Sequence, residues 1–195
     1  MGKIFCLMGK SSSGKDTIFK LLIEDRQLGL HPIIPYTTRP KRNNEENGEE
    51  YFFIDEEKLK YYDNLNKIIE LRQYHTANGI WYYCTIDDGQ IDLSKNNYLL
   101  IATLEAFKSL KSYFGNEDVY PIYIAVDDAL RLERALAREK QQANPNYDEL
   151  CRRFLADSID FSVDKLQENC VYKQYNNTII FECINAIKSD ITNLI

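Results

Sequence analysis

Apolar runs of strand length alternate along this chain with amphipathic stretches of helix length. The first run, Ile4 to Met8, is short and continuous, which is typical of a strand buried on both faces of a parallel sheet. Residues 98–102 and 119–126 have the same character. Strands that alternate with helices through right-handed crossovers form a parallel sheet covered by helices on both faces. We therefore predict an α/β fold.

The same pattern predicts the bounds of the individual elements. Predicted strands cover residues 4–8, 31–36, 51–54, 67–74, 80–85, 98–102, 119–126 and 170–175. Predicted helices cover residues 17–23, 55–62, 104–113, 127–140 and 147–167, and a C-terminal helix starts near residue 179. Asp55 and Asp127 are expected to cap two of the helices, and residues 77–79 (Ala-Asn-Gly) predict a turn between two strands. Residues 36–86 then form a β-rich insert between core elements.

Composition restricts the class of protein. The chain has 195 residues, with 24 basic and 30 acidic side chains and a net charge of −6, which gives no support for a nucleic-acid partner. The five scattered cysteines form no C-x-x-C pair, and the two histidines provide no zinc-site spacing. No apolar run approaches the roughly 20 residues that span a bilayer, and the first strand leaves no room for a signal peptide. We expect a cytoplasmic protein without a membrane partner.

A glycine-containing turn joins the first strand to the first helix. It reads Gly9-Lys10-Ser11-Ser12-Ser13-Gly14-Lys15-Asp16-Thr17. In such a loop, backbone N–H groups and the helix N-terminus surround phosphate oxygens. Gly9 and Gly14 supply backbone geometry that a side chain would obstruct, and Lys15 brings a positive charge to the β- and γ-phosphates. We predict a nucleotide-phosphate site at residues 9–17, with Mg²⁺ at Asp16 or, alternatively, at Thr17.

A second polar segment follows the predicted strand at 31–36. Arg39 and Arg42 lie three positions apart in a proline-containing loop, and arginine prefers bidentate contacts with phosphate. Tyr51 adds a neutral hydroxyl donor. Taken alone, the segment is also compatible with an ordinary solvated loop.

The order of these residues resembles the guanylate kinase signature, S-x-T-T-R-x-P-R-x-G-E-x-x-G-x-x-Y. An apolar strand ending in Glu70 and the stretch Tyr82-Tyr83-Cys84-Thr85 resemble two further motifs of that family. The resemblance covers the whole chain and is strongest in residues 9–17, 37–51 and 70–85. The residues that match the signature are Thr37, Thr38, Arg39, Arg42, Glu45, Asn47, Gly48 and Tyr51.

The resemblance implies a P-loop NTPase-type parallel sheet with a small insert and a helical lid. The implied single domain has a core of residues 1–35, 87–130 and 156–195, an insert for a nucleoside monophosphate at 36–86, and a lid at 131–155. In the insert, Arg39, Arg42, Tyr51 and Tyr83 are expected to hold the phosphate of the acceptor nucleotide.

The resemblance also implies which residues recognise the base of the acceptor nucleotide. Glu70 is expected to accept hydrogen bonds from the guanine N1–H and exocyclic amine, and Thr85 to reach a guanine acceptor atom. A buried acceptor rejects bases that lack the donors, because it would be left unpaired.

The predicted helix at 127–140 carries three arginines on one face. Arg131, Arg134 and Arg138 follow i, i+3 and i+7 spacing. The family resemblance matches Arg134 and Arg138 to a lid motif and Arg153 to a later lid arginine. It implies that Arg134 binds ATP, and that Lys15, Arg39, Arg138 and Arg153 act in catalysis by stabilising charge on the transferred group.

Several positions depart from the family pattern. Asp16 replaces Ser or Thr, Pro35 replaces a Ser, Cys84 replaces a Gly and Asn44 replaces a Gly of the signature. Thr103, which the resemblance places at the GMP site, replaces a carboxylate of an Asp-x-Asp motif. One hypothesis is that Asp16 is a relocated metal-site carboxylate.

The resemblance implies direct, in-line phosphorylation of GMP by ATP, giving GDP, with dGMP left open as a further acceptor. Two alternatives remain at this point: a kinase for another nucleoside monophosphate, and a noncatalytic interaction module. Such modules usually have a degraded phosphate loop, whereas this chain retains Gly9, Gly14 and Lys15. The expected partners are ATP and GMP or dGMP, and the expected assembly is a monomer or homodimer.

Overall fold

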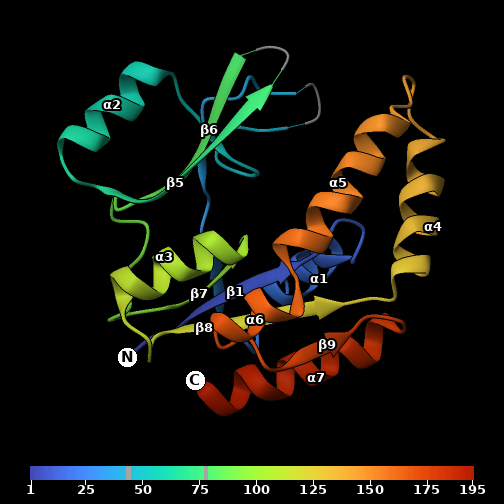
Figure 1. The fold of residues 1–195 in the computed structure, drawn as a ribbon. Helices are drawn as coiled ribbons and strands as arrows, with labels where there is room; N and C mark the ends of the chain where they lie inside the picture. The colour runs from blue at the N-terminus through green and yellow to red at the C-terminus, as the bar shows by residue number, and fades with distance from the viewer. Residues whose placement is uncertain (43–44, 77–78) are drawn as a thin grey trace.

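The computed structural model describes residues 1–42, 45–76 and 79–195. Its main sheet is parallel, and the strand order is β2-β7-β1-β8-β9 (Figure 1). The α/β fold predicted from the sequence is confirmed. The strands are β1 (Ile4–Gly9), β2 (Leu30–Pro32), β7 (Asn97–Ile101), β8 (Val119–Ala125) and β9 (Gln174–Asn176).

Both faces of the main sheet are covered, which explains the unbroken apolar sequence of β1. Ile4, Cys6 and Met8 pack on the side of α3 (Leu104–Phe114) and α6 (Val163–Glu168). The alternate residues Phe5 and Leu7 pack on the side of α1 (Lys15–Ile23) and α7 (Ile180–Leu194). Side chains of a strand alternate between faces, so β1 needs apolar residues at every position.

The insert forms a separate four-stranded sheet in the order β4-β3-β6-β5. Its strands are β3 (Tyr36–Thr37), β4 (Phe52–Phe53), β5 (Ile68–Thr76) and β6 (Gly79–Ile86), and helix α2 (Glu56–Asn64) covers one face. The Asp55 carboxylate accepts a hydrogen bond from the Lys58 N–H at 2.7 Å, so the predicted N-cap is confirmed. Residues 77–78 of the predicted turn lie outside the described residues.

The remaining helices, α4 (Asp128–Glu139) and α5 (Tyr147–Asp160), lie side by side above the edge of the main sheet in Figure 1. The predicted Asp127 cap is present, since its carboxylate accepts from the Ala129 N–H at 2.9 Å. None of the described helices is long and apolar enough to cross a membrane.

Two predicted elements are wrong. The strand expected at 31–36 is divided between β2 in the main sheet and β3 in the insert, because Pro35 has no N–H to continue a ladder. The helix expected at 147–167 is divided into α5 and α6, because Phe161 turns into the core and Ser162 caps a new helix. The last strand, predicted at 170–175, lies at 174–176.

Candidate active site

The glycine-containing loop turns from β1 into α1 at the carboxyl end of the sheet. A Cβ atom on Gly9 would lie 2.8 Å from Ser13 Oγ and 2.9 Å from the Ile124 carbonyl oxygen. Gly14 has a φ of 85°, and a Cβ there would lie 2.5 Å from Asn177 Nδ2. Any side chain at either position would therefore force the loop open.

The interior of the loop is polar and incompletely hydrogen-bonded. Ser12 Oγ and Ser13 Oγ are buried and have no hydrogen-bond partner among the described residues. Burial lowers the pKa of Lys15, and the charges of Asp16 and Asp157 act in the opposite direction. The positive charges of Arg153 and Arg138 also lower it, so these two arginines act electrostatically on Lys15. A concave set of hydroxyls, amides and cations of this kind suits an anion.

Arg131 braces the loop from α4 and is only 1% exposed. Its guanidinium donates to the Ser11 carbonyl at 3.0 Å and to Asp128 Oδ1 at 2.8 Å. Asp157 of α5 accepts a hydrogen bond from the Ser11 N–H at 2.7 Å and lies 3.4 Å from Arg131 Nη1. The first of the three helix-face arginines is thus a structural link between the loop, α4 and α5.

Arg134 lies on the other side of the loop and borders a cavity of about 310 Å³. Its Nη2 donates to the Asn177 carbonyl at 3.1 Å. Asn177 is buried, and its Nδ2 donates to the Ser13 carbonyl at 2.8 Å. The other residues that line this cavity are Gly14, Thr17, Thr178 and Ile180.

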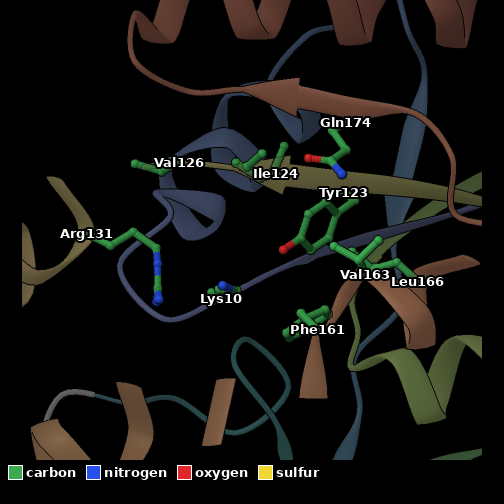
Figure 2. Close-up of a pocket in the computed structure, with 10 residues that line it drawn as sticks. Lys10, Tyr123, Ile124, Val126, Arg131, Phe161, Val163, Leu166 and Gln174 are labelled. Atoms are coloured by element: carbon green, nitrogen blue, oxygen red, sulfur yellow. The ribbon is translucent and has the colours of Figure 1, made fainter. Parts of the chain in front are cut away.

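A smaller cavity of about 180 Å³ lies between the loop, β8 and α6 (Figure 2). Lys10 and Arg131 form its polar side, and Phe161 and Leu166 form its apolar side. Lys10 Nζ lies 3.4 Å from Asp128 Oδ1. Burial raises the pKa of Tyr123 in this cavity to about 12, so its hydroxyl stays protonated at neutral pH.

The insert holds Arg39 in a network of hydrogen bonds. Arg39 is 3% exposed and makes a bidentate pair with Glu45, at 2.7 Å and 3.0 Å. Its Nε donates to the Tyr83 hydroxyl at 3.1 Å, and its guanidinium lies 5.5 Å from the centre of the Tyr51 ring. Arg42 is exposed, and its backbone N–H also donates to Glu45. Three of the four residues expected to hold a phosphate are therefore adjacent.

Glu70 lies further along the same face of the insert sheet. β5 and β6 pair Glu70 with Thr85 and Arg72 with Tyr83. The Glu70 side chain is 2% exposed, and it accepts a hydrogen bond from the Thr85 hydroxyl at 3.0 Å. Arg72 makes a second bidentate pair with it, at 2.9 Å and 3.1 Å. Burial lowers the pKa of Arg72, but the adjacent Glu70 outweighs this, and the pKa is raised.

The remaining predicted residues lie at the carboxyl ends of β1 and β7. Asp16 and Thr17 are exposed in the first turn of α1. Thr103 follows β7 and caps α3 by accepting from the Ala106 N–H at 3.2 Å. In the part of the chain that the structure describes, no group of three or more His, Cys, Asp and Glu side chains is placed to hold a metal ion.

Cys84, at the position where the family motif has Gly, lies on the face of the insert sheet opposite Glu70 and Tyr83. It is buried with Tyr36, Leu59 and Ile86 under α2. The substitution therefore fills the hydrophobic core of the insert and leaves the face with Glu70 unchanged.

Sequence reasoning missed Arg72, Asp157 and Asn177. Arg72 had a usable signal, because residues two apart on a strand share a face and Glu70 was already a candidate. Asp157 and Asn177 reach the loop across 146 and 164 positions of sequence. Their contacts leave no local pattern.

Comparisons with known proteins place the chain among relatives of one family. Residues 1–154 match the model of the guanylate kinase family. The guanylate kinase of Mycoplasma mobile is 32% identical over 96% of this chain and 91% of its own length. The guanylate kinase of Porphyromonas gingivalis is 29% identical, over 60% of this chain and 61% of its own length.

A solved structure shows the same fold. The crystal structure of guanylate kinase from Anaplasma phagocytophilum superimposes with a TM-score of 0.66 at 21% identity, covering 98% of this chain and 85% of that one. Since the family model matches most of the chain, and a relative above 30% identity aligns along nearly all of it, the chain belongs to the guanylate kinase family.

Proposed function

We propose that this protein transfers the γ-phosphoryl group of ATP to a phosphate oxygen of GMP, producing ADP and GDP. The observation that carries the proposal is the shared face of β5 and β6, where Tyr83 joins Arg39 at one end and Glu70 lies at the other. This face offers a cation and hydroxyls for a phosphate and a buried carboxylate for the donor edge of guanine. Family membership supports the same reaction.

On the donor side, we assign the ATP phosphates to residues 9–17. Lys15 supplies charge to the β- and γ-phosphates, and the loop amides and serine hydroxyls supply hydrogen bonds. Arg138 and Arg153 stabilise the charge of the phosphoryl group during transfer. The cavity beside Arg134 and Asn177 is our candidate for the donor nucleobase. No side chain has to act as a nucleophile, because transfer is direct and in line.

On the acceptor side, we assign the GMP phosphate to Arg39, Arg42, Tyr51 and Tyr83. Glu70 accepts from the guanine N1–H, and Thr103, which follows β7, is a further candidate for contact with GMP. We leave dGMP open as a second acceptor, because no described residue has been assigned to the ribose 2′-hydroxyl.

We propose Mg²⁺ as the divalent ion that accompanies ATP. Mg²⁺ uses one or two protein oxygens together with substrate phosphates and keeps several waters. The Asp16 carboxylate and the Thr17 hydroxyl are oxygen donors of this kind directly after Lys15. The ion would neutralise charge on the β- and γ-phosphate oxygens.

The domain division also remains a proposal. We assign the core to residues 1–35, 87–130 and 156–195, the acceptor insert to 36–86 and the lid to 131–155. In the structure, α4 and α5 are linked to the loop through Arg131 and Asp157. Arg131 lies within the proposed lid, and Asp157 lies just beyond it in the proposed core. The Arg131 contact supports a lid that touches the proposed site of the ATP phosphates. A cytoplasmic location and a monomer or homodimer stay predictions.

A panel of nucleoside monophosphates assayed with MgATP tests the function. We expect turnover of GMP and little of AMP, CMP or UMP. Glu70→Gln should reduce GMP turnover selectively, whereas an equal loss for every base would contradict the reading role of Glu70. A noncatalytic module would show no turnover and, in titration calorimetry, no binding of ATP.

The metal assignment has its own test. Asp16→Asn should reduce activity and weaken its Mg²⁺ dependence together, with Thr17→Val as the matched variant for the alternative ligand. Unchanged kinetics in Asp16→Asn would exclude a relocated metal-site carboxylate.

A further inference from the structure

The base-reading end of the insert contains a charged pair where a single carboxylate was expected. Arg72 lies two positions after Glu70 on the same face of β5, and its side chain is 14% exposed. Its guanidinium lies 6.0 Å from the centre of the Tyr83 ring. Arg72 therefore sits between the carboxylate for the base and the tyrosine for the phosphate.

Arg72 reduces the hydrogen-bonding capacity that Glu70 can offer to a base. A carboxylate has about four lone-pair positions. Three hydrogen bonds already reach Glu70, from Arg72 Nε to Oε2, from Arg72 Nη2 to Oε1 and from the Thr85 hydroxyl to Oε1. Oε1 accepts two of them, so the free acceptor position is on Oε2. Guanine offers two donors on this edge, N1–H and the 2-amine, and the free position suits one of them.

The pair also changes which group donates to the base. The Thr85 hydroxyl has one proton, which it gives to Glu70. Arg72 has five N–H donors, and its Nη1 makes no hydrogen bond within residues 1–42, 45–76 and 79–195. Arg72 therefore has N–H groups left to donate to a keto oxygen, whereas the Thr85 hydroxyl has no further proton to donate.

We propose that Arg72 is a second base-reading residue, which donates to the O6 atom of the purine while Glu70 accepts from N1–H. The site then reads the 6-keto and N1–H pair, and it depends only weakly on the 2-amine. This inference rests on the proposed kinase function and extends its substrate class to 6-oxopurine monophosphates, so that IMP is phosphorylated as well as GMP.

The same pair rejects adenine at both atoms. The adenine 6-amine would bring a donor against Arg72, and the unprotonated N1 would bring an acceptor against Glu70. A buried donor that faces another donor, or a buried acceptor that faces another acceptor, is left without a hydrogen bond, and nothing compensates for the loss. Discrimination against AMP therefore comes from both residues.

Steady-state assays with GMP, IMP and AMP test the proposal in the wild type and in Arg72→Met. In the wild type, kcat/KM for GMP and IMP should differ by less than about tenfold, the effect of one modest hydrogen bond. Arg72→Met removes two of the three hydrogen bonds to Glu70, so that each carboxylate oxygen has a free acceptor position for guanine while Oε1 still accepts from Thr85. The GMP-to-IMP ratio should then rise roughly tenfold, while the GMP-to-AMP ratio falls.

Two results would overturn the proposal: an unchanged GMP-to-IMP ratio in Arg72→Met, or a wild type that uses GMP and not IMP. If Arg72 only held Glu70 in place, its loss would lower kcat/KM for GMP and IMP by the same factor. Arg152→Met is the matched control, because it removes an exposed arginine that makes the same bidentate pair with Glu149. It should leave all ratios unchanged.

Failure of this inference is distinguishable from failure of the proposed function. If no nucleoside monophosphate is phosphorylated by the wild type, the function itself is wrong. If GMP is phosphorylated and the ratios do not respond to Arg72, only the inference is wrong. Thermal unfolding and binding of a non-hydrolysable ATP analogue show whether Arg72→Met is folded with an intact donor site.

Discussion

The donor and acceptor ends of this site are prepared for their anions in different ways. At the loop, Ser12 and Ser13 keep buried hydroxyls without partners among the described residues, and Lys15 stands with a lowered pKa. In the insert, Arg39 and Arg72 are each held by a carboxylate in a bidentate pair. The two serine hydroxyls of the loop lack hydrogen-bond partners among the described residues, whereas Arg39 and Arg72 of the insert already have carboxylate partners.

This difference predicts where single substitutions act most strongly. A bound phosphate supplies partners that the loop lacks, so the loss of Lys15 removes charge stabilisation from the proposed phosphate site. In the insert, the substrate either adds a hydrogen bond to an existing ion pair or replaces one partner of that pair. Removing the cation also leaves its carboxylate without a partner. The donor end should therefore govern kcat, and the acceptor end should govern KM for GMP.

The largest effect should follow Lys15→Met. Because Lys15 is a half-buried cation at the start of α1, we expect kcat to fall roughly 10²- to 10³-fold. A coupled assay for ADP measures it at saturating GMP. Lys20→Met, on the exposed side of the same helix, should change kcat less than twofold. A near wild-type kcat in Lys15→Met would show that this lysine of the loop has no part in catalysis.

Arg39→Met should produce the next largest effect, on the acceptor side. We expect KM for GMP to rise on the order of 50-fold, because a charge-assisted bidentate contact is lost. Arg39→Lys keeps the charge without the fork and should recover only part of the loss. Titration with an ATP analogue should give the wild-type Kd in both variants. A weakened ATP Kd with an unchanged KM for GMP would reverse the assignment of the two ends.

Regular elements were predictable because periodicity and caps are local. The buried run of β1 and the caps Asp55 and Asp127 are visible in a few adjacent residues. The two errors arose where tertiary structure overrides a continuous pattern. Pro35 separates β2 from β3, and burial of Phe161 ends α5 before α6 begins.

The sequence indicated which residues belong to the candidate site better than it indicated how those residues contact one another. Motif order placed Lys15, Arg39 and Glu70, but it did not show that Arg39 and Glu70 already have partners. Arg131 shared a helical face with Arg134, yet it is buried as a brace because Asp157 reaches it from another helix. Such pairs depend on how helices meet, and that information is not local.

Asp157→Asn probes the loop amide of Ser11, which already has a side-chain partner. The Asp157 carboxylate accepts from the Ser11 N–H and places a negative charge beside the phosphate site. Asparagine keeps an acceptor oxygen without the charge, so we expect an ATP analogue to bind about fivefold more tightly. Asp160→Asn, on the same helix and exposed, is the control. Weaker binding in Asp157→Asn would mean that the carboxylate supports the loop more than it repels phosphate.

A smaller effect concerns the pair that holds Arg39. Hydrogen bonding with Arg39 lowers the pKa of Glu45 from its usual 4.5, so the pair stabilises the folded protein above that pH. The stabilisation is lost as the pH falls through the lowered pKa of the folded state. Urea unfolding at pH 7 should show Glu45→Gln less stable by about 1 kcal/mol, and the difference should shrink below pH 4.5.

Glu149→Gln sharpens the comparison. Its partner Arg152 makes the same bidentate geometry, but the two side chains are 45% and 65% exposed, against 13% and 3% for Glu45 and Arg39. Solvent screens an exposed pair, so Glu149→Gln should change the free energy of unfolding by less than about 0.5 kcal/mol. Equal losses in the two variants would show that burial adds nothing to the Arg39 pair, and that the insert is no more preorganised than the protein surface.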